Sequence, residues 1–227
     1  MKKITLKIVN IILLLCAAAC LVCYDIFGGL WLKGVTSSWF VLLGAVNLWA
    51  ARQLPWKNRR VLILIEAGLF CGMCADVLLG IVFFAGVGVF ALGHVFYLVA
   101  FYFLERFRLR DLVMSLPAAA VSIFLVVGTP WIHVEDPVMR AILIVYALII
   151  SAMLGKAVSN LVSQSDTFRW LLAIGSIMFW FSDLILLMDM FGTSSRLTWI
   201  LCSYSYWPAQ NILAHALYHA KLGQSDT

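Results

Sequence analysis

Residues 142–150 read ILIVYALII, a run that contains no charged residue. A strand of a transmembrane β-barrel would instead alternate apolar and polar residues over about ten positions, because its two faces meet lipid and lumen in turn. A continuous apolar run is typical of a transmembrane helix, which needs about 20 mostly apolar residues. This run therefore predicts that the chain crosses a membrane as α-helices.

The composition of the whole chain supports the same interpretation. Of its 227 residues, 64% are hydrophobic and only 12% are charged, and the mean hydropathy is +1.01. Soluble domains are about half apolar and a quarter charged, so this chain has too little polar surface to cover a globule in water. These proportions exclude a soluble enzyme, a disordered chain and an ordinary nucleic-acid binder. We expect an all-α integral membrane bundle that forms a single domain over residues 1–227.

Charged or turn-rich breaks divide the apolar sequence into eight segments, each long enough to be read as a span. Because the connections between them are short, neighbours in the sequence are expected to pack as antiparallel neighbours in space. The boundaries are predicted to within about 2–4 residues. The eight predicted spans are 6–27, 37–52, 60–79, 85–104, 111–128, 138–159, 168–191 and 197–220.

The distribution of positive charge predicts the orientation of these spans. If the N-terminus lies inside, the outer segments hold only Lys33, Arg140 and Arg196, and the inner segments hold the other 13 of the 16 lysines and arginines. Cytoplasmic segments of membrane proteins are enriched in these residues. Both termini are therefore predicted to be cytoplasmic, and the net charge of +5 reflects topology rather than a surface for nucleic acid.

All six cysteines lie within predicted spans, and none is in an outer loop where an oxidising compartment would form a disulfide. Cys71 and Cys74 have the spacing of a redox or zinc pair, but no second pair or nearby histidine completes such a site. We expect the cysteines to act as small packing residues. The sequence predicts no metal ion and no other cofactor.

A few ionisable residues lie inside the predicted spans, where a charge costs about 2.5–3.5 kcal/mol at mid-span and therefore suggests function. At a rise of about 1.5 Å per residue, one group falls in the outer half of the membrane, together with a tyrosine, and a second group falls in the inner half. The outer group comprises Asp76, His94, Asp183 and the tyrosine Tyr206, with Lys33 at the outer mouth of the second span, whereas the inner group comprises Glu66, Lys156 and His215.

Each outer residue also has a structural interpretation. Asp76 by itself would cap the turn that follows its helix, and His94 by itself would bond a carbonyl in the core. Tyr206 and Gln210 lie on one helical face, where polar residues often join helices. Asp183 is the hardest to explain in this way, because it lies deep within an apolar stretch.

A short sequence similarity connects two of the spans. Residues 75–79 read ADVLL and residues 182–186 read SDLIL, so the two aspartates are 107 positions apart (183 − 76). Both segments run from inside to outside in the predicted topology. A parallel duplication of four helices would bring Asp76 and Asp183 to one central cavity.

Four motifs, in this order, resemble the YhhN-type lysoplasmalogenases. They are Ala75-Asp76 with Phe83-Phe84-Ala85-Gly86, then Gly93-His94-Val95-Phe96-Tyr97, then Gly175-x3-Phe179-x2-Ser182-Asp183, and finally Tyr204-x-Tyr206-x2-Ala209-Gln210. The resemblance covers the chain from about Lys33 to the end of the eighth span. Two positions depart from the pattern: Ala75 stands where the family often has glycine, and Gly34 stands where it often has proline after a lysine.

The resemblance implies an enzyme of the bacterial cytoplasmic (inner) membrane that hydrolyses the vinyl-ether bond of lysoplasmalogens to a fatty aldehyde and a glycerophospho-alcohol. Such chemistry suits one acidic and one ionised carboxyl group, so we expect Asp183 to be the acid and Asp76 the base, roles that the sequence leaves exchangeable. His94 would orient a carboxylate or a water. The expected partners are a lysophospholipid substrate and membrane lipids. The predicted substrate-binding residues are Lys33, Tyr97, Ser182, Tyr204, Tyr206 and Gln210.

Three other functions stay open at this point. A proton-coupled transporter would use Glu66, Lys156 and His215 to complete a path through the inner half of the membrane. A non-catalytic membrane protein would bind a lysolipid unchanged. A different membrane hydrolase would act on another ether, an epoxide or an ester, although the chain has no Gly-x-Ser-x-Gly motif of a serine esterase.

Overall fold

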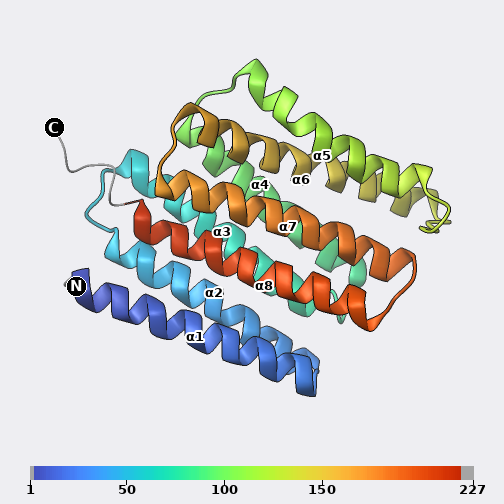
Figure 1. The fold of residues 1–227 in the computed structure, drawn as a ribbon, viewed down its shortest axis with the longest axis horizontal. Helices are drawn as coiled ribbons and strands as arrows, with labels where there is room; N and C mark the ends of the chain where they lie inside the picture. Colours follow the sequence, from blue (N-terminus) through green and yellow to red (C-terminus); the bar gives the residue numbers. More distant parts are fainter. Residues whose placement is uncertain (1–2, 221–227) are drawn as a thin grey trace.

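The computed structural model describes residues 3–220, which form a bundle of eight α-helices (Figure 1). No strand occurs within these residues. The predicted all-α membrane bundle is therefore confirmed, and each predicted span corresponds to one helix. The helices are α1 (Lys3–Phe27), α2 (Leu30–Ala50), α3 (Trp56–Leu78), α4 (Phe83–Leu104), α5 (Leu109–Gly128), α6 (Pro137–Ser163), α7 (Thr167–Phe191) and α8 (Arg196–His219).

The largest boundary difference is at the start of α2, which begins at Leu30 rather than at Ser37. Gly28 and Gly29 separate it from α1 and adopt φ angles of 65° and 91°, which residues with a Cβ atom rarely adopt. This pair turns the chain so tightly that α2 resumes at once. Consequently, Lys33 lies within the first turns of α2 rather than in a loop before it.

Six of the helices are long and apolar enough to cross a membrane by length and composition: α1, α3, α4, α5, α6 and α7. The other two, α2 and α8, have 21 and 24 residues and lie alongside them in the bundle (Figure 1). Their lower hydropathy comes partly from polar side chains that are buried inside the protein, such as Ser37, Asn47 and Gln210. Helix α1 begins and α8 ends at the same end of the bundle (Figure 1), as the predicted topology requires.

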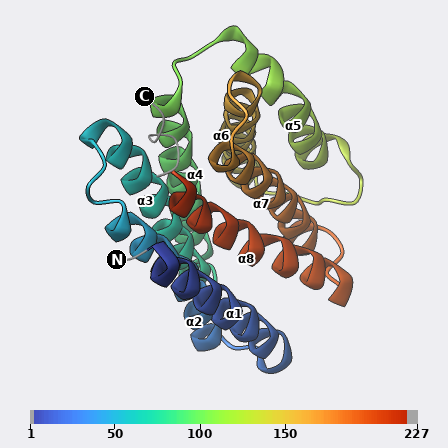
Figure 2. The ribbon, with the colours of Figure 1, turned by 60° about the vertical axis from the view of Figure 1, so that its left-hand side comes forward.

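The helices do not all pack in sequence order. Successive helices pack together from α1 to α4 and again from α5 to α8, but within the described residues α4 does not pack along α5. Instead α6 packs against both of them, so it lies between α4 and α5 (Figure 2). The expectation that neighbours in the sequence are neighbours in space is therefore wrong at this one connection.

The same packing pattern occurs in both halves of the chain. The pairs α1–α2, α2–α3 and α3–α4 have counterparts in α5–α6, α6–α7 and α7–α8, and the cross-pair α2–α8 has its counterpart in α6–α4. This arrangement is the one that a parallel duplication of four helices predicts. Each half also carries one buried polar connection between its first two helices: Asn10 with Asn47, and Asp111 with Lys156.

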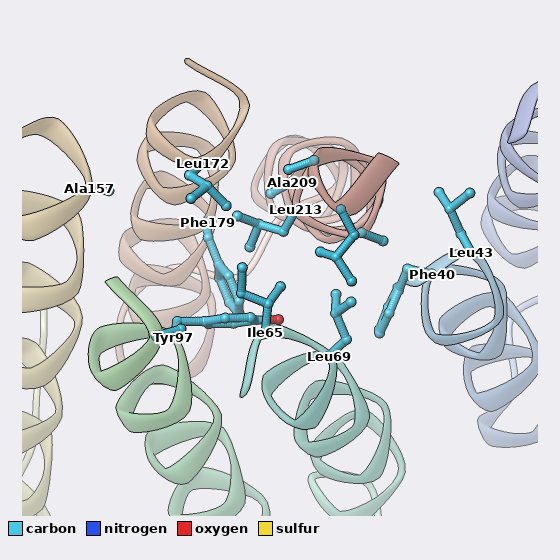
Figure 3. Close-up of a cluster of buried hydrophobic side chains, with 14 of the residues drawn as sticks. Phe40, Leu43, Ile65, Leu69, Tyr97, Ala157, Leu172, Phe179, Ala209 and Leu213 are labelled. Carbon is cyan, nitrogen blue, oxygen red and sulfur yellow. The ribbon is translucent and has the colours of Figure 1, made fainter. Parts of the chain in front are cut away.

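The core lies where α2, α3, α4, α7 and α8 meet. Leu69 and Ile65 of α3, Tyr97 of α4 and Phe179 of α7 point into it and are almost completely buried (Figure 3). Such packing gives polar side chains on the same helices fixed rotamers, because a close-packed interior leaves little room for alternatives. The candidate site is built on this rigid centre.

Candidate functional site

Asp183 of α7 is held by two side chains from other helices. The Tyr146 hydroxyl of α6 donates a hydrogen bond to Asp183 Oδ2 at 2.5 Å, and His94 Nε2 of α4 lies 3.2 Å from the same oxygen. His94 Nε2 is also 2.9 Å from the Tyr146 oxygen. Because the tyrosine hydrogen already points to the carboxylate, a proton on Nε2 satisfies both histidine contacts. The three residues form a closed triangle.

The His94 ring is fixed by its aromatic neighbours. It is completely buried, and its centroid lies 4.5 Å from that of Phe179 and 5.3 Å from that of Tyr146. Among residues 3–220, the second oxygen of Asp183, Oδ1, has only a long contact of 3.5 Å from the Ser182 hydroxyl. The triangle therefore engages one oxygen of the carboxylate strongly and leaves the other available.

Asp76 of α3 is the centre of a second cluster. Its Oδ2 accepts hydrogen bonds from the Ser37 hydroxyl at 2.5 Å and from the Tyr206 hydroxyl at 2.8 Å. Its Oδ1 lies 3.8 Å from Lys33 Nζ. The indole of Trp207 donates to the Ser37 oxygen at 3.1 Å, which fixes the direction in which Ser37 donates. Both oxygens of Asp76 thus have partners, and the carboxylate is 2% exposed.

A chain of hydrogen bonds continues from this cluster toward the middle of the bundle. Gln210 Nε2 donates to the Tyr206 oxygen at 3.3 Å, and the Tyr97 hydroxyl donates to Gln210 Oε1 at 2.8 Å. Two glycines of α3 make room for it. A Cβ atom at Gly72 would lie 2.5 Å from Gln210 Nε2, and one at Gly68 would lie 2.5 Å from the Tyr97 ring, so these positions have no space for a side chain.

Two phenylalanines separate the clusters. The ring of Phe179 lies 5.3 Å from that of Tyr206 on one side and 4.5 Å from that of His94 on the other. Phe90 packs against both Phe179 and Tyr206, at 6.3 and 5.7 Å. Aromatic rings therefore pack between the networks of Asp76 and Asp183, and within the described residues no hydrogen bond joins the two networks.

A cavity of about 240 Å³ adjoins the Asp183 cluster. Its wall is mostly aliphatic and aromatic and includes Phe90, but it also contains Asp183, Tyr146 and Lys33. Lys33 is the connection between the two clusters, because it both lines the cavity and pairs with Asp76. Asp76 is not among the lining residues, so only one of the two predicted aspartates lies in the wall.

The chemistry of this cavity is that of a proton donor or acceptor facing apolar surroundings, with one cation in the wall. Within residues 3–220, no group of three or more histidine, cysteine, aspartate or glutamate side chains is placed to hold a metal ion. What the described residues bring together is a carboxyl group, a phenol, an imidazole and an ammonium group.

A family model described as the YhhN family matches residues 30–217. The chain belongs to the YhhN family. The match includes α2 to α7 and nearly all of α8, which agrees with the extent of the sequence resemblance. Comparison with curated proteins gave no match, and comparison with solved structures gave none. Membership of the YhhN family supports a lysoplasmalogenase-like function at the level of the family.

Of the nine predicted YhhN site residues, only Lys33 and Asp183 line the cavity among the described residues, and two of the others, Tyr204 and Ser182, also make no short hydrogen bond within either cluster. The Tyr204 hydroxyl donates to Asp25 at the rim of the bundle, where Arg196 also contacts Asp25, and the side chain is 39% exposed. The Ser182 hydroxyl donates to the Phe179 carbonyl at 2.6 Å, which is a bond within its own helix. Sequence motifs do not separate such residues from their site neighbours because motif residues can point in different directions. Both stay predictions as substrate-binding residues, without a cavity contact in their support.

The three inner ionisable residues do not form one polar path. Lys156 Nζ lies 2.9 Å from Asp111, and His215 Nδ1 lies 2.9 Å from Asn10 Oδ1. Glu66 lies against Gly44, and its Oε2 is buried without a hydrogen-bond partner among the described residues. Two of the three groups, Lys156 and His215, therefore join pairs of helices. These contacts favour a structural role for the inner residues over the proton path of a transporter.

Sequence reasoning missed Tyr146 and Ser37, which donate the two shortest hydrogen bonds to the aspartates. Tyr146 is hidden in the apolar run 142–150 that identifies the membrane helix. One signal was present: Asp183 and Tyr146 fall in the outer half of their helices and His94 falls at the middle of α4, so the depth of Tyr146 is similar to that of the predicted site residues. Serine is common in membrane helices, and Ser37 carried no comparable signal.

Proposed function

We propose that this protein hydrolyses the vinyl-ether bond of lysoplasmalogens in the bacterial cytoplasmic membrane, releasing a fatty aldehyde and a glycerophospho-alcohol. The observation that carries the proposal is the position of Asp183. It lines an apolar cavity, with one oxygen held by Tyr146 and His94 and the other free, and Lys33 lines the same cavity. A lipid substrate needs these features: space for a chain, a proton source and a positive charge for the phosphate.

The reaction begins with the transfer of a proton to the vinyl-ether carbon that is β to the oxygen. Protonated Asp183 donates this proton from its free oxygen, which leaves a carboxylate and an oxocarbenium ion. Water then adds to the cationic carbon, and the carboxylate accepts a proton from that water, as the acid residue of a retaining glycosidase does. The hemiacetal collapses to the aldehyde and the alcohol. One water is consumed, and Asp183 recovers its proton.

Tyr146 and His94 act on the charge that develops in this step. As the proton leaves Asp183, negative charge grows on the carboxylate, and the two hydrogen bonds to Oδ2 become stronger. Donors that are fixed before the reaction lower the barrier because they need no reorganisation when charge appears. His94 thus keeps the orienting role that the sequence suggested.

Asp76 supports the site through Lys33. Phe90 stands in the cavity wall and packs against Tyr206, the partner of Asp76, so its ring lies between the cavity and the Asp76 cluster. Because Asp76 does not line the cavity, we assign it to hold Lys33 for the phosphate rather than to activate water. Ser37 and Tyr206 stabilise the Asp76 carboxylate for this role. Tyr97 and Gln210 extend the network and keep Tyr206 in place.

The test is aldehyde release by the purified protein in lipid vesicles. We expect turnover of a lysoplasmalogen and none of its alkyl-ether analogue, because a saturated ether has no carbon that accepts the proton. Asp183→Asn should abolish release. Asp189→Asn is the matched control, since Asp189 lies on the same helix but bonds Ser194 and Thr198 at the rim.

Two results would overturn the proposal. Equal turnover of both ethers would exclude carbon protonation. Binding of the lysoplasmalogen without release of aldehyde, unchanged in Asp183→Asn, would indicate the non-catalytic binder instead.

A further inference from the structure

The cavity is too small for the whole hydrocarbon chain of a membrane lipid. An engineered cavity of about 150 Å³ holds one benzene, a molecule of six carbons, so the 240 Å³ here corresponds to roughly ten carbons on that scale. A chain that spans one leaflet, about half of the ~30 Å hydrocarbon core, has more carbons than this. If the vinyl-ether bond lies at Asp183, part of the chain must lie outside the cavity.

One side of the cavity lies between two helices, α5 and α7, that do not pack along each other within the described residues. The walls formed by α3 with α4, α4 with α6, and α6 with α7 consist of helices that pack along each other, whereas α5 packs along α6 and does not pack along α7 within the described residues. Yet α5 contributes Ser122 and Val126 to the lining, and α7 contributes Trp180 and Leu184. The cavity therefore reaches the gap between α5 and α7.

A single hydrogen bond crosses this gap. Trp180 Nε1 donates to Ser122 Oγ at 2.9 Å, and among residues 3–220 no other side-chain hydrogen bond joins α5 to α7. Ser122 in turn donates to the Ala118 carbonyl at 2.8 Å, so its oxygen is oriented to accept from the indole. Trp180 is half-buried, which places the ring between the cavity and the outside.

The outer side of this gap is apolar. Next to Ser122 on α5, Val121 is 44% exposed, and near Trp180 on α7, Ile177 and Phe181 are 46% and 40% exposed. In a membrane, such surfaces on spanning helices face lipid. An opening here would lead from the cavity into the hydrocarbon of the bilayer rather than into water.

We propose that the substrate's hydrocarbon chain passes from the cavity into the bilayer between α5 and α7, through a lateral opening that the Trp180–Ser122 hydrogen bond closes. This inference rests on the proposed function, because it takes the reacting bond to lie at Asp183. Trp180 is then a specificity-determining residue: chains that fit the cavity react with the opening closed, and longer chains react only when the indole moves aside.

The first test measures binding rather than turnover, so that its failure is distinguishable from failure of the proposed function. The probes are two alkyl-ether lysophospholipids with a diazirine at the chain end, one with about eight carbons, which fits the cavity, and one with a leaflet-length chain. After irradiation in vesicles, mass spectrometry locates the label. We expect the long probe to label the exposed residues Val121, Ile177 and Phe181, which do not line the cavity. The short probe should label the cavity wall, and unlabelled analogue should compete with both.

The control for nonspecific labelling is the lipid-facing surface of α1, where Ile8 and Leu15 are 51% and 65% exposed. Unlabelled analogue should not reduce labelling there. Long-probe labelling confined to the cavity wall, or equal competition at α1 and at the α5–α7 gap, would overturn the lateral opening. Either result would leave aldehyde release unaffected.

The second test compares chain lengths in two tryptophan variants. Trp180→Ala should raise the ratio of long-chain to short-chain kcat/KM by about threefold to tenfold, because one hydrogen bond between membrane helices no longer has to break. Trp170→Ala is the matched control: Trp170 also lies on α7 and its indole also donates to a serine, Ser165, at 3.0 Å, but it does not line the cavity. An unchanged ratio in Trp180→Ala, or the same change in Trp170→Ala, would refute the role of Trp180.

Discussion

Replacing Tyr146 with phenylalanine removes one oxygen atom and keeps the ring that packs 5.3 Å from His94. The lost hydroxyl donates to Asp183 Oδ2 at 2.5 Å, and a hydrogen bond to a charged group contributes about 1.5–3 kcal/mol. Since the charge on Asp183 appears only as the proton leaves, this energy is lost in the transition state and not in the bound ground state. With RT of about 0.59 kcal/mol, kcat should fall about tenfold to 150-fold.

The fall should stop short of complete inactivity, because His94 Nε2 remains 3.2 Å from the carboxylate. The assay has two parts: initial rates of aldehyde release in vesicles, and binding of the alkyl-ether analogue, which should be unchanged. Tyr102→Phe is the matched control. Tyr102 packs on Phe107 near the end of α4 and does not line the cavity, so its kcat should stay at the wild-type value. The reasoning is refuted if Tyr146→Phe retains full kcat, or if it loses binding of the analogue to the same extent as turnover.

Three further substitutions test other parts of the molecule. Lys33→Met should raise KM about tenfold or more, the value of one charge-assisted hydrogen bond to a phosphate, with a smaller change in kcat in the same vesicle assay. Asp76→Asn should also raise KM, because Lys33 loses the carboxylate that holds it. Loss of kcat with unchanged analogue binding would instead identify Asp76 as the base. Lys156→Met should destabilise the protein by about 3–5 kcal/mol, since the buried Asp111 loses its cationic partner and keeps only the donors Ser159 and the Arg108 N–H. Lys156→Met with Asp111→Asn should recover part of this in denaturant unfolding. Equal stability of the single and double variants would contradict a buried ion pair.

The eight helices were predictable because a membrane imposes a simple rule on sequence. Every span must be apolar over about 20 residues, so the breaks between spans can be read from charge and turn residues. The same rule explains the one large error. The start of α2 contains Gly34, Thr36, Ser37 and Ser38, which resemble a loop in composition. Thr36 and Ser37 are nevertheless buried, and they donate to the Leu32 carbonyl and to Asp76, whereas the exposed Ser38 donates to the Val35 carbonyl.

The residues of the site were predictable where they depart from this rule, that is, where an ionisable side chain lies in an apolar span. Asp76, Asp183 and His94 were identified because a charge in a membrane needs an explanation, and the structure gives each of them polar partners. Tyr146 was not, since a tyrosine costs little in an apolar helix. The contacts of Tyr146 with Asp183 and His94 could not be predicted from the sequence either. They depend on the packing of α6 between α4 and α5, an arrangement that connection lengths alone do not specify.

The duplicated packing gives a physical reason for two aspartates with two different roles. Each aspartate accepts a hydrogen bond from a hydroxyl on the preceding helix, Ser37 or Tyr146, and has a second partner from the helix that crosses between the halves, Tyr206 or His94. Two identical clusters would give two carboxyl groups with the same surroundings, whereas a proton donor must face the carbon that accepts its proton. The clusters differ in their donors and in their surroundings: one has a lysine and a glutamine network around it, and the other has an apolar cavity beside it. Acid chemistry is therefore expected at Asp183, because only there does the carboxyl group meet the substrate's chain rather than further polar side chains.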